Sequence, residues 1–183
     1  MEYFSIIKDS DIFEDPTAEP KEYITRLTVK GLVFDSDNKI ALLCNPIGYG
    51  LLPGGGVEKE ENLESAFMRE CREELGCQIE ITSKIGVAIQ LRDRQGQKYE
   101  IHFYVSKILG EKGTPTTQQE DELQATIKWL TLEELHQQLE YQVSTIKKDY
   151  YQTQFNSRTH LAALKLYLST IEGVRQERIQ PSR

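Results

Sequence analysis

The chain has few cysteines, and they are not arranged for a metal site or a disulfide framework. Its three cysteines, Cys44, Cys71 and Cys77, are odd in number and include no Cys-x-x-Cys pair. This pattern predicts free thiols in a reducing compartment and disfavours a zinc site or a disulfide-stabilised secreted domain. We therefore expect a cytoplasmic protein.

Long apolar runs and a basic leader are also lacking. No stretch approaches the length of a membrane span, and residues 1–16 have neither a basic start nor a cleavable apolar core. We therefore expect no membrane segment. A chain of 183 residues with 38% hydrophobic and 28% charged residues is expected to form one globular domain. We place this domain at residues 23–172, after an N-terminal extension (1–22) and before a C-terminal tail (173–183).

Basic residues are outnumbered. The chain has 22 Lys and Arg against 29 Asp and Glu, for a net charge of −7. General nucleic-acid binding needs a basic face, and the sequence shows none. The acidity is concentrated in residues 58–80, which hold eight acidic and three basic residues. We therefore expect a nucleotide to bring its phosphates to this stretch through a metal cation.

Residues 53–77 read PGGGVEKEENLESAFMRECREELGC. Asn62 is suited to cap a helix, and Gly76 is suited to end it in a left-handed conformation. Three carboxylates at i, i+3 and i+4 share one face of this helix: Glu70, Glu73 and Glu74. Like charges at this spacing repel, so a compensating cation is expected nearby. Hard divalent ions such as Mg²⁺ take oxygen ligands of this kind and keep positions for water and substrate phosphates.

The three glycines before the helix allow the backbone to bend sharply and to approach a ligand closely. Gly54 is a candidate to place a carbonyl oxygen on the metal, and Gly55 and Gly56 are candidates to contact substrate. By itself the glycine run is more typical of an ordinary strand-to-helix turn. By themselves the acids are more typical of a solvated helix face. A solvated acidic face explains neither the glycines nor Arg69.

Together these residues resemble the Nudix box, Gly-x5-Glu-x7-Arg-Glu-U-x-Glu-Glu-x-Gly-U, in which U is a bulky apolar residue. Gly55 and Glu61 begin the match, and Cys71 and Cys77 fill the two U positions. The resemblance implies an α/β (α+β) fold, an α/β/α sandwich with a mixed sheet between helices. It also implies hydrolysis, dependent on Mg²⁺ or Mn²⁺, of a nucleoside diphosphate derivative, in which NDP-X and water give NMP and P-X.

The same resemblance implies functions for individual residues. Glu70, Glu73 and Glu74 would bind metal, and Arg69 would orient Glu61 and Glu73. The general base would be Glu73 or an acid from a later loop, with Glu122 the first candidate and Glu120 the second. Two departures from the family pattern, Gly50 in place of an aromatic residue and Glu60 in place of glycine, are expected to change the loop shape and the fit of substrate.

Outside this stretch the sequence predicts strands at 23–34, 39–44, 78–91, 99–108 and 125–130 and helices at 132–139 and 158–171. Arg26 interrupts the apolar pattern of the first strand, either as an exposed residue or as a contact to substrate phosphate or base. Arg92 and Arg94 are expected in a solvated turn. Residues 1–22 could cover a sheet edge or pack on a partner chain, so a homodimer stays open.

Two functions of different kinds follow from the pattern. One is the metal-dependent hydrolase, and the other is a Nudix-fold sensor that binds a nucleotide without cleaving it. Three intact metal-binding acids favour the hydrolase, because a sensor does not need all three. An isomerase of isoprenoid diphosphates would need a reactive cysteine, whereas Cys71 is expected on the packed helix stripe and Cys44 in a strand.

Overall fold

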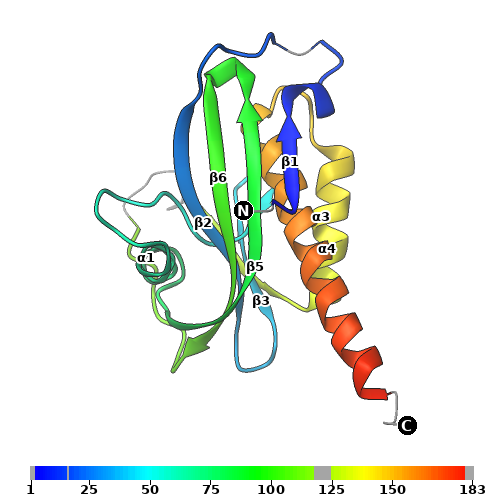
Figure 1. The fold of residues 1–183 in the computed structure, drawn as a ribbon. Helices are drawn as coiled ribbons and strands as arrows, with labels where there is room; N and C mark the ends of the chain where they lie inside the picture. Colours follow the sequence, from blue (N-terminus) through cyan, green and yellow to red (C-terminus); the bar gives the residue numbers. More distant parts are fainter. Residues whose placement is uncertain (1–2, 16, 118–124, 180–183) are drawn as a thin grey trace.

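A computed structural model of the chain describes residues 3–15, 17–117 and 125–179. Within them, one sheet has seven strands, and three α-helices flank it (Figure 1). The strands are β1 (Ser5–Lys8), β2 (Ile24–Phe34), β3 (Ile40–Cys44), β4 (Gly50–Leu51), β5 (Gln78–Arg92), β6 (Gln97–Leu109) and β7 (Thr126–Leu130). The helices are α1 (Leu63–Leu75), α3 (Leu132–Thr145) and α4 (Tyr151–Ile179).

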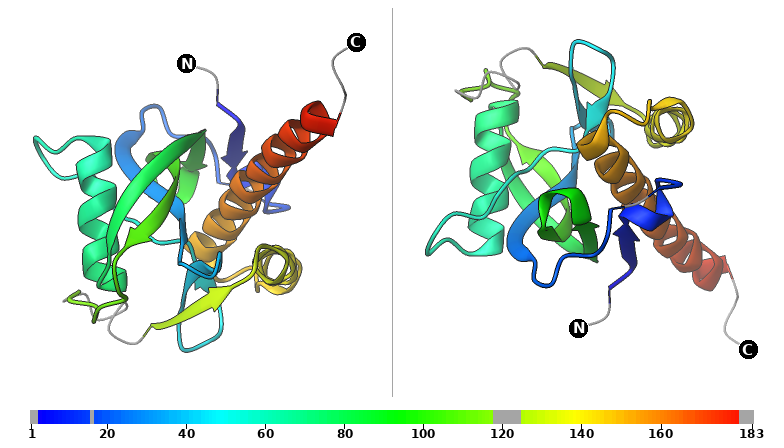
Figure 2. Two further views of the ribbon diagram at one scale, coloured as in Figure 1. Left: turned by 90° about the horizontal axis from the view of Figure 1, so that it is seen from below. Right: turned by 90° about the horizontal axis from the view of Figure 1, so that it is seen from above.

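The sheet is mixed and lies between two helical layers. Its strand order is β1-β5-β6-β2-β3-β4, with β7 paired to β3. The pairs β1–β5 and β2–β6 are parallel, and the other pairs are antiparallel. Helix α1 covers one face, while α3 and α4 cover the other (Figure 2). The predicted α/β/α sandwich with a mixed sheet is therefore confirmed.

Each helical layer closes its own apolar cluster. Phe67, Cys71 and Leu75 of α1 are buried against β2, β3 and β6. On the opposite face, Leu135 and Leu139 of α3 join Ala163 and Leu164 of α4 over the other side chains of the same strands. Alternate residues of a strand point to opposite faces, which explains why the nearly all-apolar β3 is buried on both sides.

The sheet splits between β2 and β3. These strands pair only at Phe34 and Ile40, and beyond that point the free edge of β2 is taken by the loop that follows β4. Val29 N donates to Gly55 O over 2.9 Å, and Gly31 N donates to Pro53 O over 3.1 Å. The glycine loop thus runs through an opening in the sheet, where residues of α1 and of α4 border one cavity.

Helix α1 begins and ends at the predicted residues. Asn62 Oδ1 accepts a hydrogen bond from Ser65 N over 2.8 Å, which satisfies one of the free amides of the first turn. Gly76 has a left-handed φ of 66°, and its N–H donates to Arg72 O. The two caps therefore fix the register of the acidic residues on the helix.

Helix α4 is longer than the expected helix at 158–171, because it starts at Tyr151 and runs to Ile179. Its first turn is held by the N-terminal segment. Asp9 is fully buried, and its Oδ1 accepts a hydrogen bond from the Tyr151 hydroxyl. Phe13 stacks on the Tyr151 ring with centroids 5.5 Å apart. None of the described helices combines the length and apolarity that crossing a bilayer requires.

Candidate active site

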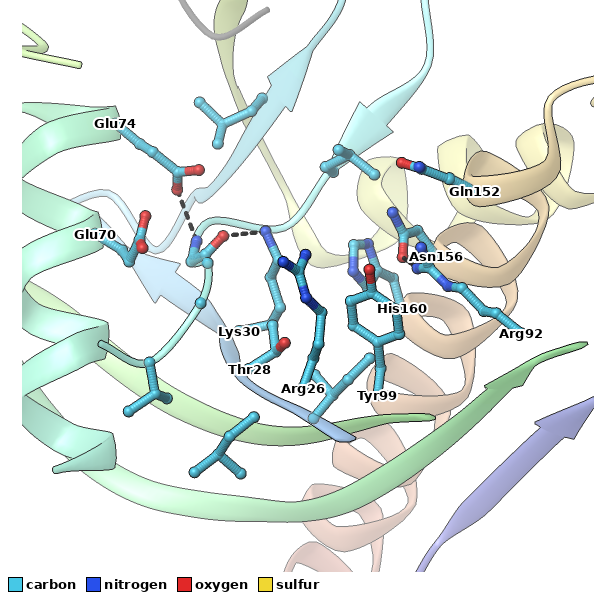
Figure 3. A pocket seen from close by; sticks show the side chains of 18 of the residues that line it. Arg26, Thr28, Lys30, Glu70, Glu74, Arg92, Tyr99, Gln152, Asn156 and His160 are labelled. Atoms are coloured by element: carbon cyan, nitrogen blue, oxygen red, sulfur yellow. Dashed lines mark hydrogen bonds between the residues drawn. The ribbon is translucent and has the colours of Figure 1, made fainter. Parts of the chain in front are cut away.

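A cavity of about 780 Å³ lies at the opening in the sheet. Figure 3 shows the acids of α1 at one end and the first turns of α4 at the other, with β2 side chains between them. Its wall includes Arg26, Thr28, Lys30, Gly54, Gly55, Gly56, Glu70, Glu74, Arg92, Tyr99, Gln152, Asn156 and His160. The cavity therefore combines a carboxylate-rich end with a cationic and amide-rich end.

The glycine loop is tied to both the helix and the sheet. Gly54 has a φ of 122°, and a side chain at this position would collide with the Val29 carbonyl. Its N–H donates to Glu74 Oε2 over 2.7 Å, and its carbonyl oxygen accepts a hydrogen bond from the Lys30 ammonium. Gly55 lies against the Glu70 carboxylate so closely that a methyl group would overlap it. Gly54 is therefore needed for the close approach of the loop to β2, and Gly55 for its close approach to α1.

Arg69 gathers three carboxylates. Its Nη1 donates to Glu70 Oε1 over 2.9 Å and to Glu73 Oε2 over 3.2 Å. Its Nε and Nη2 both contact the Glu61 carboxylate over 3.1 Å, and Nη2 also donates to Gly56 O over 2.9 Å. Arg69 is thus the compensating cation expected from the sequence, and it links the helix acids to the glycine loop.

The environments of these carboxylates differ. Hydrogen bonding from Arg69 lowers the pKa of Glu61 below its usual range. Burial raises the pKa of Glu70, although Arg69 and the charge of Lys30 act in the opposite direction. Glu70 and Glu74 are buried, whereas the side chain of Glu73 is 39% exposed. Glu73 is therefore the acid of this group that is most accessible to water.

The oxygen donors fit a hard divalent cation in kind and in charge. The Lys30 ammonium donates to the Gly54 carbonyl, so this oxygen faces a positive charge. In the structure, Arg69 and the Gly54 amide donate hydrogen bonds to the acids of α1. The described residues contain no group of three or more His, Cys, Asp or Glu side chains spaced to hold a metal. A metal would therefore take over oxygens that the protein's own donors now occupy.

Most of the sequence-predicted site residues lie in one region. Glu61, Arg69 and Glu73 form one hydrogen-bonded group. The cavity is lined by the other predicted residues that the structure describes: Arg26, Gly54, Gly55, Gly56, Glu70 and Glu74. Arg26 is exposed at the cavity wall. Glu120 and Glu122 lie outside the described residues. The loop before them is anchored here, since the amides of Thr116 and Thr117 donate to Glu73 O over 2.8 and 3.1 Å.

Several residues that line the cavity were not predicted from sequence as site residues. Lys30 shares a face of β2 with Arg26, and alternation along the strand is the signal that could have identified it. Arg92 was expected in a solvated turn but is only 3% exposed, because its side chain packs under α4. Burial lowers the pKa of His160, and its Nδ1 accepts a hydrogen bond from Leu52 N over 3.3 Å.

The chain matches known proteins in sequence. The profile of the NUDIX domain matches residues 24–153. The ADP-ribose pyrophosphatase of Methanocaldococcus jannaschii is 39% identical over 90 residues, which cover 46% of this chain and 53% of that relative. The chain therefore spans about half the length of this curated relative.

Solved structures match the fold. The MutT NUDIX hydrolase from Burkholderia pseudomallei has a TM-score of 0.51 at 23% identity, over 61% of this chain and 86% of that chain. A NUDIX hydrolase from Nitrosomonas europaea has a TM-score of 0.52 at 17% identity, over 75% of this chain and 90% of that chain. At these identities the likeness concerns the fold, and it agrees with the layers described above.

Proposed function

This chain belongs to the NUDIX domain family, and from that membership and its cavity we propose that it is a Mg²⁺- or Mn²⁺-dependent pyrophosphohydrolase. The substrate is a nucleoside diphosphate derivative, which is cleaved at its diphosphate to a nucleoside monophosphate and a phosphorylated product. The observation that carries the proposal is the meeting of the glycine loop with Glu70 and Glu74 at one cavity, where Arg69 holds Glu70 from outside the cavity wall.

Glu70, Glu73, Glu74 and the Gly54 carbonyl would hold the metal. When bound, a divalent cation would neutralise charge on the phosphate oxygens and favour attack of water on the phosphorus. Arg69 keeps the acids aligned through its bonds to Glu70 and Glu73. Glu61 in turn fixes the guanidinium from its other side.

The chain's own residues also supply phosphate contacts and a base. Lys30 lies on the cavity face of β2 beside Gly54, where its charge can bind oxygens of the diphosphate. Arg26 lies on the same face, where it can contact another phosphate or the base of the substrate. Glu73 is our first candidate to accept the proton from the attacking water, because it is the accessible acid of the group. Glu122 is the alternative base, as the family resemblance implies.

A substrate panel tests this function. Nucleoside diphosphate derivatives, including ADP-ribose, are incubated with Mg²⁺, Mn²⁺ or EDTA, and products are identified by mass. We expect a nucleoside monophosphate and its phosphorylated partner with either metal and no cleavage in EDTA. Tight binding measured by calorimetry, with no product from any compound, would instead establish a sensor.

Gly55 offers a separate test of the metal site. We expect Gly55→Ala to push the Glu70 carboxylate aside and to weaken Mg²⁺ binding roughly tenfold or more, as loss of ligand support does elsewhere. The measurement is the Mg²⁺-induced rise in melting temperature, together with calorimetric affinity. In Gly56→Ala, the matched variant, the added methyl group meets no atom within 4 Å, so the Mg²⁺ response should persist. Equal Mg²⁺ responses in both variants would place the metal elsewhere.

A further inference from the structure

Arg92 is a buried cation at the end of the cavity away from α1 (Figure 3). Its guanidinium lies over the Tyr99 ring, 4.0 Å from the centroid. Its Nε and Nη2 donate to Gln90 Oε1 over 2.9 and 2.6 Å, and Nη2 also donates to Asn156 Oδ1 over 2.8 Å. All of these partners are neutral, so the positive charge is held in place without being neutralised.

No carboxylate forms an ion pair with Arg92 within residues 3–15, 17–117 and 125–179. A buried guanidinium without a counter-charge is costly. Arg26 adds a second guanidinium to the same cavity and makes no ion pair in that part of the chain either. Two cations that repel each other in one cavity indicate that an anion completes the arrangement.

The hydrogen-bonding groups that Arg92 and Asn156 leave free at this end are donors. Nη1 of Arg92 makes no hydrogen bond to any described residue. The amide of Asn156 is oriented by Arg92 and Gln90, which both donate to its Oδ1. Its Nδ2 is thereby left as a donor. Gln90 is itself fixed, because its Nε2 donates to Thr159 Oγ1 over 2.8 Å. A rigid set of donors fits a ligand group that only accepts.

We propose that Arg92, Arg26 and Asn156 form a second anion subsite, which binds a phosphate monoester of the substrate away from the diphosphate that is cleaved. A guanidinium fork matches phosphate oxygens in geometry and charge. The role of this subsite in binding substrate rests on the proposed hydrolase function. It narrows the substrate class to nucleotides with a further phosphate, either on the ribose of the nucleoside or on the linked moiety.

Binding without turnover tests this subsite directly. The probes contain no diphosphate, and calorimetry is done in EDTA. AMP is compared with adenosine 2′,5′-bisphosphate and adenosine 3′,5′-bisphosphate, and ribose 5-phosphate with ribose 1,5-bisphosphate, so that each pair differs by one further phosphate. We expect at least one bisphosphate to bind about tenfold or more tightly than its counterpart, since charge-assisted bonds to phosphate are stronger than neutral ones. The pair that shows the difference identifies which half of the substrate carries the phosphate.

Variants assign the difference to these residues. Arg92→Gln and Arg26→Gln should each reduce the affinity ratio towards one, whereas Arg72→Gln, an exposed arginine of α1 outside the cavity, should keep it. If Arg92→Gln fails to fold, as judged by its melting curve, the Arg26→Gln variant decides the outcome.

Equal affinities within every pair, or an unchanged affinity ratio in the folded variants, would overturn the subsite. An Arg92→Gln loss equal for AMP and both adenosine bisphosphates would assign the arginine to the nucleoside instead. Hydrolysis is not measured here, so failure of the subsite and failure of the hydrolase remain distinguishable.

Discussion

Glu74→Gln is expected to lower kcat by about two to three orders of magnitude while leaving the fold intact. Glu74 is only 5% exposed, and its Oε2 accepts the hydrogen bond from Gly54 N over 2.7 Å. A glutamine can keep that bond through its amide oxygen, so the glycine loop stays in place. What is lost is one negative charge at the proposed metal site, and turnover in saturating Mg²⁺ measures that loss.

Glu64→Gln provides the matched control for this variant. Glu64 lies in the first turn of the same helix and is exposed, so its replacement removes the same charge away from the cavity. We expect near wild-type turnover and an unchanged melting temperature for this control. If Glu74→Gln turns over substrate as fast as Glu64→Gln does, Glu74 is not a metal ligand.

Arg69→Met is expected to destabilise the metal-free protein by about 2 to 3 kcal/mol, which is less than the scale for breaking a fully buried ion pair because solvent partly screens this one. The Arg69 side chain is 22% exposed, and it bonds to Glu61, Glu70 and Glu73. Without it these carboxylates repel one another, and the Gly56 carbonyl loses its donor. Urea unfolding in EDTA measures the free energy of unfolding.

Adding Mg²⁺ separates electrostatic repulsion from lost packing in this variant. A cation that binds only the folded state restores stability by mass action, so we expect Mg²⁺ to raise the stability of Arg69→Met more than that of the wild type. Arg72→Met, an exposed change on the same helix, should stay within about 0.5 kcal/mol of the wild type. Equal stability of the two variants would show that Arg69 does not compensate the acids.

The acidic end of the cavity was largely predictable from sequence because its signals are local. Asn62, Gly76 and the spacing of the helix acids all lie within one helix and its caps, and short-range geometry places them. The strands were predictable for a similar reason, since alternation of apolar residues is a local pattern. Even the need for a cation beside the acids followed from their spacing, and Arg69 meets it.

The opposite end of the cavity was not predictable from sequence, because it is formed by residues that lie far apart in the chain. Arg92 and Asn156 are 64 positions apart, and nothing in the sequence around Arg92 distinguishes a buried guanidinium from a solvated one. Residues 151–157 are mostly polar and show no clear apolar stripe, so the first turns of α4 were missed. Only the packing of α4 on β5 gives these polar side chains a common position.

The hydrogen bond between Tyr151 and Asp9 joins residues 142 positions apart. A contact of this range closes a very large loop, so it forms only after the intervening chain has been ordered. Domains are synthesised from the N-terminus, and the residues of α4 that border the cavity emerge after those of β2 and α1. A nascent chain can therefore fold β2, the glycine loop and α1 while the cavity still lacks one wall. Assembly of the acidic end thus precedes the ability to enclose a ligand.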